Sequence, residues 1–260
     1  MHSIRQLFSL EGKTALVTGG SRGLGLQIAE ALGEQGAKIM LSSRNQSDLD
    51  DAVEHLRTRG IHASAIAADL SRDAVAAPLV AATLKRLGHI DILINNAGAT
   101  WEAPAEDHPI EAWDQVMNLN IRSIFLLSQA VGKQSMIPRR YGRIVNLASI
   151  AGLGGNMPGT MQTIAYNTSK GAVINFTRTL AGEWGRYGIT VNALAPGIFP
   201  SKMTRDVLEK LGKEELATHA PLLRIGDDED LKGAALLFSS DAGKHITGQI
   251  LAVDGGVSAV

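Results

Sequence analysis

The segment Thr14-Ala-Leu-Val-Thr-Gly-Gly-Ser-Arg-Gly-Leu-Gly25 decides the fold of this chain. Its first five residues have the apolar character of a short buried strand, and its glycines lead directly into a stretch with the apolar period of a helix. The backbone N–H groups at the start of such a helix can face a pyrophosphate, and glycines permit close approach. The segment therefore predicts a dinucleotide-binding turn.

The glycine spacing in this turn does not by itself identify a nucleotide site. It is T-G-x-x-x-G-x-G rather than G-x-G-x-x-G, so the usual dinucleotide fingerprint is not met. A glycine-rich turn between a strand and a helix also occurs for tight packing alone. The nucleotide prediction therefore depends on support from other parts of the chain.

The rest of the chain continues the alternation of short β-rich apolar runs and longer helical segments. Strands are predicted at residues 14–18, 38–42, 62–67, 90–95, 142–147, 190–195 and 250–253. Helices are predicted over residues 24–35, 46–59, 74–87, 114–137 and 166–187. No linker or repeat interrupts the pattern. It predicts one α/β domain over residues 1–260, a Rossmann-like doubly wound parallel sheet of about seven strands with helices on both faces.

The composition excludes several classes of protein. A formal net charge of −1 over 260 residues gives no electrostatic reason to expect nucleic acid or an anionic membrane as a partner. The absence of cysteine excludes disulfides and thiolate metal sites, and it favours a cytoplasmic location. We expect no signal peptide, and no run approaches the ~20 apolar residues of a transmembrane helix. The seven histidines lack metal-ligand spacing, so no catalytic metal is expected.

A tyrosine and a lysine lie four residues apart in Tyr166-Asn-Thr-Ser-Lys170. On a helix these two side chains share one face, so the ammonium can reach the neighbourhood of the phenol. A nearby cation favours phenolate and is expected to lower the pKa of Tyr166 from its usual value of ~10. Such a phenol can exchange a proton with an alcohol or a ketone. Together with the glycine turn, the pair predicts a redox enzyme.

The end of the second predicted strand indicates which dinucleotide is bound. In NAD-binding chains an acidic residue ~20 residues after the glycines binds the ribose 2′-OH. Here the stretch is Met40-Leu-Ser-Ser-Arg-Asn45, which contains no acid. Arg44 follows this strand and Arg22 lies in the glycine turn, and two guanidiniums suit a 2′-phosphate. The pattern predicts NADP(H); the alternative is that both arginines are solvated loop residues.

Further motifs follow in order and extend over almost the whole chain. They are Asp69-Leu70, Asn95-Asn-Ala-Gly98, Asn120, Ser149, Pro196-Gly197, Thr247-Gly-Gln249 and Val253-Asp-Gly-Gly256. With the glycine turn and the Tyr166–Lys170 pair, this ordered set resembles the NADP-preferring branch of the short-chain dehydrogenase/reductase family. Any one of these motifs is common by chance, whereas their joint order is not.

The resemblance implies a role for each matching residue. Asn120, Ser149, Tyr166 and Lys170 would be the catalytic residues. Tyr166 would transfer the proton, Ser149 would hydrogen-bond the substrate oxygen, Lys170 would also bind the cofactor ribose, and Asn120 would hold a water. Asn118 competes with Asn120 for that last role. The residues that would bind the cofactor are Gly19, Ser21, Arg22, Gly23, Leu24, Gly25, Ser43, Arg44, Asp69, Leu70, Asn96, Ala97, Gly98, Tyr166, Lys170, Pro196, Gly197, Ile198 and Ser201.

The resemblance also implies an NADPH-dependent ketone reductase of the 3-oxoacyl thioester type that forms a homotetramer. One alternative is a polyol or sugar-acid dehydrogenase, and another is a non-catalytic NADP-binding sensor. The segment 150–165 is longer than we expect for the family. Its Met157 and Met161, together with Trp101 and the segment 202–220, are candidates for the walls of the substrate pocket. The alternative for the methionines is an ordinary surface loop.

Overall fold

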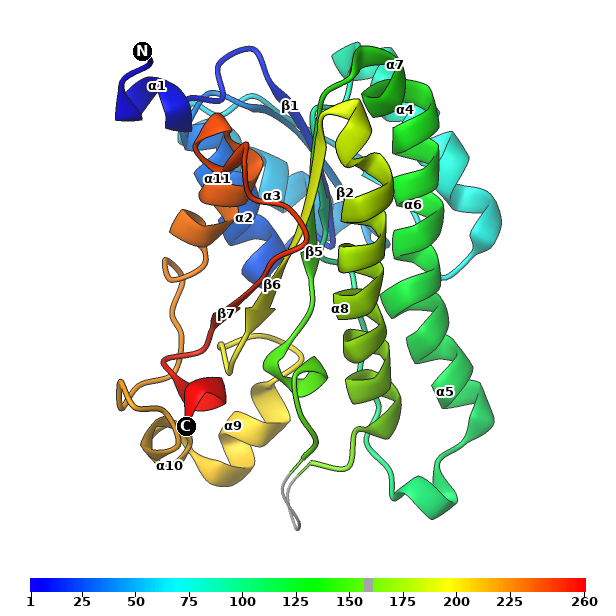
Figure 1. Ribbon diagram of the computed structural model, residues 1–260. Coiled ribbons are helices and arrows are strands. Elements are labelled where there is room, and N and C mark those ends of the chain that lie inside the picture. The colour runs from blue at the N-terminus through cyan, green and yellow to red at the C-terminus, as the bar shows by residue number, and fades with distance from the viewer. Residues whose placement is uncertain (157–160) are drawn as a thin grey trace.

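Seven parallel strands form one sheet in the order β3-β2-β1-β4-β5-β6-β7 (Figure 1). The structure is a computed structural model, and it describes residues 1–156 and 161–260. The strands are β1 (Thr14–Thr18), β2 (Lys38–Ser43), β3 (Ala63–Ala67), β4 (Ile92–Asn95), β5 (Gly142–Leu147), β6 (Ile189–Pro196) and β7 (Ile250–Val253). The predicted α/β sheet of seven strands is confirmed.

Helices cover both faces of this sheet. In Figure 1, α4, α6 and α8 stand on one side of the strands, and α2, α3 and α11 stand on the other. The helices are α1 (Ile4–Phe8), α2 (Gly23–Glu34), α3 (Gln46–Thr58), α4 (Ala76–Leu87), α5 (Ile110–Met117), α6 (Ser123–Val131), α7 (Ile137–Arg139), α8 (Ile164–Trp184), α9 (Arg205–Leu211), α10 (Lys213–Thr218) and α11 (Lys232–Ser239). The doubly wound arrangement predicted from the alternating pattern is therefore present.

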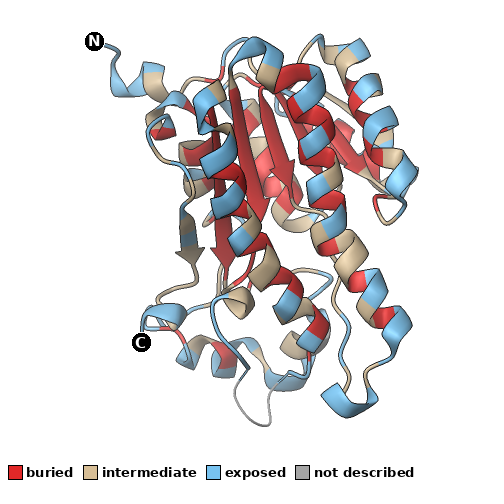
Figure 2. Ribbon diagram, turned by 45° about the vertical axis from the view of Figure 1, so that its right-hand side comes forward, coloured by how far each residue is buried: buried red, intermediate tan, exposed pale blue. Residues whose placement is uncertain are grey.

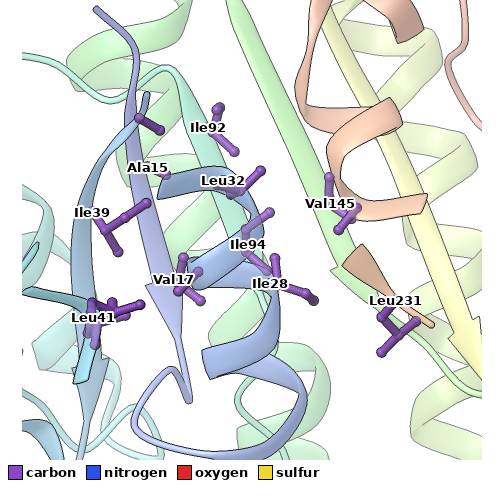
Figure 3. Packing of buried hydrophobic residues seen from close by; sticks show 14 of the residues in the cluster. Ala15, Val17, Ile28, Leu32, Ile39, Leu41, Ile92, Ile94, Val145 and Leu231 are labelled. Carbon is purple, nitrogen blue, oxygen red and sulfur yellow. The ribbon is translucent and has the colours of Figure 1, made fainter. Parts of the chain in front are cut away.

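The core forms around β1, which is buried along its whole length. Val17 is in register with Leu41 of β2 and with Ile94 of β4. Ile28 and Leu32 of α2 pack over these side chains (Figure 3). A strand covered by helices on both faces carries apolar residues without alternation, which is the pattern that β1 shows. Figure 2 shows that the central strands are buried, while the helices are buried mainly where they meet the sheet.

The strand order reverses at β1, because the chain moves outward to β2 and β3 and then returns to the other side as β4. Ligands of open α/β sheets bind at the carboxyl ends of the strands at such a switch point. Here the turn after β1 meets the loop after β4. The Asn96 Nδ2 donates to the carbonyl oxygens of Thr18 at 2.9 Å and Gly19 at 3.0 Å.

The predicted helical segment 114–137 is divided by two π-helical turns. The first, Asn118–Arg122, joins α5 to α6, and the second, Gly132–Met136, joins α6 to α7. A π turn adds a residue to the helical turn and is frequent at functional sites. The first π turn contains Asn120, whose side chain is fully buried.

The short helices α9 and α10 lie beyond the carboxyl ends of the strands, close to the C-terminus of the chain (Figure 1). They occupy the segment 202–220 that was predicted to border the substrate pocket. Leu222, just after this segment, donates its backbone N–H to the carbonyl of Gly255 at 3.0 Å. Across residues 1–156 and 161–260, no helix combines the length and the apolar character needed to cross a membrane.

Candidate active site

Ser149 and Tyr166 meet at the carboxyl end of β5. Ser149 is buried two residues beyond this strand, and its Oγ accepts a hydrogen bond from the backbone N–H of Ala151 at 3.1 Å. Tyr166 lies in the first turn of α8, with the Ser149 hydroxyl near enough to its phenol to favour the phenolate. A hydroxyl and a phenol placed in this way can both serve one substrate oxygen.

Lys170 lies one helical turn after Tyr166 and is almost completely buried. Its Nζ donates a hydrogen bond to the carbonyl oxygen of Leu147 at 2.6 Å and lies 5.5 Å from the centroid of the Tyr166 ring. Burial disfavours the charged amine and lowers the pKa of Lys170 from 10.5 to about 8. The amine can therefore gain and lose a proton near neutral pH.

The prediction that Lys170 lowers the pKa of Tyr166 is wrong for this structure. Burial raises the pKa of Tyr166 above 10.0, and the nearby Ser149 hydroxyl only partly opposes that effect. The physical reason is that the phenol is enclosed and its phenolate would lose solvation. The Lys170 ammonium meanwhile donates to the Leu147 carbonyl rather than to the phenol.

The structure brings Asn120 to this site, whereas Asn118 lies at the start of the π turn and is only partly buried. The Asn120 Nδ2 donates to the carbonyl of Ala99 at 2.9 Å and to the Ser169 Oγ at 2.9 Å. Its Oδ1 accepts from the backbone N–H of Ala99 at 2.8 Å. Both amide donors of Asn120 are thus in use within the protein. Ser169 was not predicted, although it lies three residues after Tyr166 on the same helix.

The glycine turn has the close backbone contacts that a nucleotide cradle requires. Gly19 has a φ of 61°, and a Cβ there would lie 2.7 Å from the Asn96 Nδ2. A Cβ on Gly25 would fall within the contact distance of Gly19 and Asn96. Ser21 and Leu24 are partly buried in the same turn. Side chains at these glycines would displace the turn from the loop after β4.

Thr18 holds the turn to the loop after β4, and sequence reasoning missed its role. Its Oγ1 donates to the carbonyl of Ile94 at 3.2 Å and accepts from the backbone N–H groups of Asn96 at 3.0 Å and Ala97 at 3.1 Å. Gly98 follows in this loop, and a Cβ there would lie 3.3 Å from the Asn120 Oδ1 and 3.8 Å from the Lys170 Nζ. The position of Thr18 at the end of a strand, directly before the glycines, is the signal that could have identified it.

The two arginines predicted to bind a 2′-phosphate lie near the carboxyl ends of β1 and β2. Arg22 immediately precedes α2, and its Nη1 forms an ion pair with the Asp48 Oδ2 at 3.1 Å. Arg44 is exposed and directly follows β2, whose last residue is the partly buried Ser43. The ion pair with Asp48 was not predicted.

Asp69 and the buried Leu70 follow β3 at the same edge of the sheet. The Asp69 Oδ1 accepts hydrogen bonds from the Oγ of Ser71 at 2.8 Å and from its backbone N–H at 3.2 Å. The Ser71 side chain is the main reason why the pKa of Asp69 lies below 3.8, and the positive charge of Arg44 adds to the effect. Asp69 therefore remains ionised at neutral pH.

The loop after β6 completes this edge of the sheet. Pro196 ends the strand, and a Cβ on Gly197 would lie 2.8 Å from the Cβ of Asp254. The Ile198 carbonyl accepts from Gly226 at 2.9 Å. Ser201 follows, and its Oγ lies 3.0 Å from the Thr204 Oγ1. The Cβ position of Gly23 is 4.0 Å from the Cβ of Ser201, so the loops after β1 and β6 nearly touch.

The predicted walls of the substrate pocket are only partly described. Met157 lies outside the described residues. Met161 lines a cavity of about 400 Å³ together with Ala103, Ile164 and Asn167. Asn167 of α8 borders this cavity, whereas Tyr166 does not. Trp101 lies in the loop after β4 and is 44% exposed. Met161 thus borders a hollow beside the phenol and not the phenol itself.

The strand order, the glycine turn and the cluster of Ser149, Tyr166 and Lys170 together define an α/β oxidoreductase whose site lies at the switch point of the sheet. The chain matches the short chain dehydrogenase family over residues 13–212, and it belongs to that family. Dehydrogenases and reductases of this family interconvert an alcohol and a carbonyl group, and this chain belongs to the same reaction class.

The chain is similar to curated and solved proteins along nearly its whole length. It is 42% identical to gluconate 5-dehydrogenase of Gluconobacter oxydans, with 97% of each chain covered. It is 37% identical to the rhamnolipids biosynthesis 3-oxoacyl-[acyl-carrier-protein] reductase of Pseudomonas aeruginosa, covering 96% of this chain and 97% of that one. A crystal structure of a gluconate 5-dehydrogenase from Burkholderia cenocepacia in complex with NADP and tartrate superposes with a TM-score of 0.93 at 33% identity. It covers 99% of this chain and 100% of that chain.

Proposed function

We propose that this chain uses NADP(H) to interconvert a ketone and a secondary alcohol, with Asn120, Ser149, Tyr166 and Lys170 as the catalytic residues. The observation that carries the proposal is the placement of the Ser149 hydroxyl near the Tyr166 phenol, with the buried Lys170 one helical turn further along α8. A phenol and a hydroxyl directed to one point can serve a single carbonyl oxygen.

The residues at the switch point fit a dinucleotide. The turn around Gly19 and Gly25 leaves no room for side chains where the backbone would approach a pyrophosphate. Arg22 and Arg44 supply the cationic groups for a 2′-phosphate, and the loops carrying Asn96 and Ser201 border the same edge. When bound, the nicotinamide supplies or accepts the hydride. NADP in the related Burkholderia structure supports the choice of NADP(H) for this chain.

The chain's own residues handle the proton. Tyr166 would donate its phenolic proton to the alkoxide oxygen as the carbonyl is reduced, while Ser149 stabilises charge on that oxygen through its hydroxyl. The Lys170 Nζ, with a pKa of about 8, would hold a proton close to the phenolate and restore it to Tyr166. Asn120 ties the loop of Ala99 to the π turn and would hold both in place beside Lys170.

For the substrate we propose a 3-oxoacyl thioester. Three exposed apolar side chains stand on the loops that follow β4, β5 and β6, namely Trp101, Leu153 and Met203. Exposed apolar side chains on the loops at this edge of the sheet favour contact with an apolar chain over contact with water. The second candidate is a sugar acid, which the 42% identity to gluconate 5-dehydrogenase favours.

The test is the rate of NADPH consumption with acetoacetyl-coenzyme A and with 5-keto-D-gluconate, under identical conditions. A higher kcat/KM for the thioester supports the first substrate, and a higher value for the keto acid supports the second. NADPH binding without turnover of either compound, or of simple cyclic ketones, would support the non-catalytic sensor instead.

We further propose a homotetramer that works in the cytoplasm. The exposed Phe125 on α6 and Leu251 on the edge strand β7 support burial of these surfaces between subunits. The absence of cysteine supports a reducing compartment. Sedimentation at several protein concentrations tests the first point, since a persistent monomer would exclude a tetramer. Cell fractionation tests the second.

A further inference from the structure

We propose that Asp48 is a specificity-determining residue for the cofactor, because its carboxylate competes with the 2′-phosphate of NADP(H) for the Arg22 guanidinium. This inference rests on the proposed function, since it takes the carboxyl ends of β1 and β2 to be the site of the adenine ribose. It predicts that the native chain binds NADP(H) less tightly than its two arginines would allow.

Asp48 lies where the glycine turn meets the end of β2. The backbone N–H of Gly20 donates to the carbonyl of Ser42 at 3.4 Å, so the glycine turn contacts the end of β2. Asn45 follows, and its Oδ1 caps α3 by accepting from the N–H groups of Ser47 at 2.9 Å and Asp48 at 3.4 Å. This geometry places the Asp48 carboxylate in the first turn of α3, facing the turn after β1.

Asp48 and Arg22 form a partly exposed ion pair. The Arg22 Nη1 lies 3.1 Å from the Asp48 Oδ2, and the side chains are 57% and 30% exposed. One nitrogen of the guanidinium is thus engaged, while more than half of the Arg22 side chain remains open to a ligand. In the described part of the chain, Arg22 is the ion-pair partner that the structure gives to this carboxylate.

The Asp48 carboxylate carries the same sign of charge as a 2′-phosphate. A 2′-phosphate that binds Arg22 must approach the Asp48 carboxylate, which is held by the same guanidinium. Two anions that contact one guanidinium repel each other. The repulsion acts on NADP(H) and spares NAD(H), which has a hydroxyl at this position. Arg44 differs from Arg22 here, because the carboxylate that feels its charge, Asp69, is already hydrogen-bonded to Ser71.

The opposite role for Asp48 is to orient Arg22 and so to strengthen NADP(H) binding. If Asp48 served to orient Arg22 for the phosphate, removal of its charge would weaken NADP(H) binding. The α3 N-terminus does not depend on the Asp48 side chain for its cap, since Asn45 supplies that cap. Asp48→Asn therefore changes the charge beside Arg22 while it leaves the start of the helix capped.

The experiment is isothermal titration calorimetry of NADP⁺ and NAD⁺ with the full chain, without any substrate. Asp48→Asn should lower the Kd of NADP⁺ by ~3- to 10-fold and leave that of NAD⁺ within ~2-fold. An unchanged or raised Kd for NADP⁺ overturns the inference. The matched control is Asp51→Asn, which removes the same charge from an exposed position on the same helix. An equal gain in that variant would trace the effect to total charge and also overturn the inference.

A double variant tests whether Arg22 mediates the effect. In an Arg22→Ala background, Asp48→Asn should give no further gain in NADP⁺ affinity beyond that of Asp51→Asn. A gain of the same size as in the native background contradicts the competition. The proposed function has its own failure, which is the absence of binding of either nucleotide to the native chain. Normal NADP⁺ binding without an Asp48 effect removes only this inference.

Discussion

Asn120 and Ala99 exchange two hydrogen bonds, one from the Asn120 Nδ2 to the Ala99 carbonyl at 2.9 Å and one from the Ala99 N–H to the Asn120 Oδ1 at 2.8 Å. This reciprocal pair fixes the loop after β4 to the π turn between α5 and α6. The loop carries Gly98, which adjoins both Asn120 and Lys170. The buried Asn120 amide thus joins the loop after β4, which is proposed to border the cofactor, to the surroundings of Lys170.

Replacing Asn120 by alanine should therefore affect both stability and catalysis. The variant leaves the Ala99 N–H and carbonyl without their partner and removes one of the two hydrogen bonds of the Ser169 hydroxyl, and the expected loss of unfolding free energy is ~2–4 kcal/mol. Urea unfolding followed by circular dichroism measures the loss, and kcat should fall in the same variant. Asn118→Ala is the control, because its side chain is only partly buried. Equal losses in both variants would contradict the assignment of Asn120.

Tyr166→Phe removes the phenolic oxygen with little change in packing. If Tyr166 is the proton donor, kcat should fall by ~10²- to 10⁴-fold while the Kd for NADPH stays within ~2-fold. Single-turnover kinetics and fluorescence titration of NADPH give the two values. Tyr187→Phe is the matched control, since Tyr187 lies at the far end of the same helical segment. A native kcat in Tyr166→Phe would defeat the catalytic assignment.

The buried amine of Lys170 gives the protein a specific dependence on pH. Its pKa in the folded chain is about 8, below the 10.5 of an exposed lysine, so the unfolded chain binds more protons between these values. Stability should therefore rise as the pH increases from 8 to 10.5, by ~3 kcal/mol at most.

Lys170→Met has no buried amine, so its free energy of unfolding should not rise between pH 8 and 10.5 for this reason. Urea unfolding of both proteins at pH 7, 9 and 10.5 measures the difference, and groups that titrate in both chains cancel. At pH 7 the free energy of unfolding of Lys170→Met should exceed that of the native chain by the largest margin. Parallel curves over the whole range would show that the Lys170 pKa is close to that of a free lysine.

Arg44→Ala tests the choice of cofactor. Loss of a charge-assisted contact with a 2′-phosphate should reduce kcat/KM for NADPH by ~10-fold or more and leave that for NADH nearly unchanged. Arg57→Ala removes an exposed arginine of α3 away from the carboxyl edge and serves as the control. Equal efficiency of NADPH and NADH in the native enzyme would end the NADP(H) proposal.

The fold was predictable because its signals are local. The predicted limits of β1, β5 and β7 agree with the structure, since each is an apolar run bounded by turns. The fourth strand was predicted from Ile90 but begins at Ile92. The reason is a distant contact, in which Ile90 exchanges hydrogen bonds with the Ser135 hydroxyl at 2.9 and 3.1 Å instead of pairing along the sheet.

The electrostatics of the site were less predictable, because they depend on enclosure and on partners far along the chain. The spacing of Tyr166 and Lys170 shows that they share a helix face, but it does not show that burial outweighs their attraction. Likewise, nothing near Arg22 in the sequence indicates that Asp48 is its partner. Such pairings arise only when the sheet brings the ends of β1 and β2 together.

The hydrogen bonds from Asn96 to Thr18 and Gly19 have a further consequence for how the enzyme meets its cofactor. They hold the glycine turn in shape before any nucleotide arrives, so little conformational entropy is lost on association. A preorganised cradle of this kind allows rapid capture and exchange of the dinucleotide between turnovers. We expect the anchored turn to resist trypsin at the peptide bond after Arg22 in the free enzyme, and Asn96→Ala should make cleavage at that bond faster.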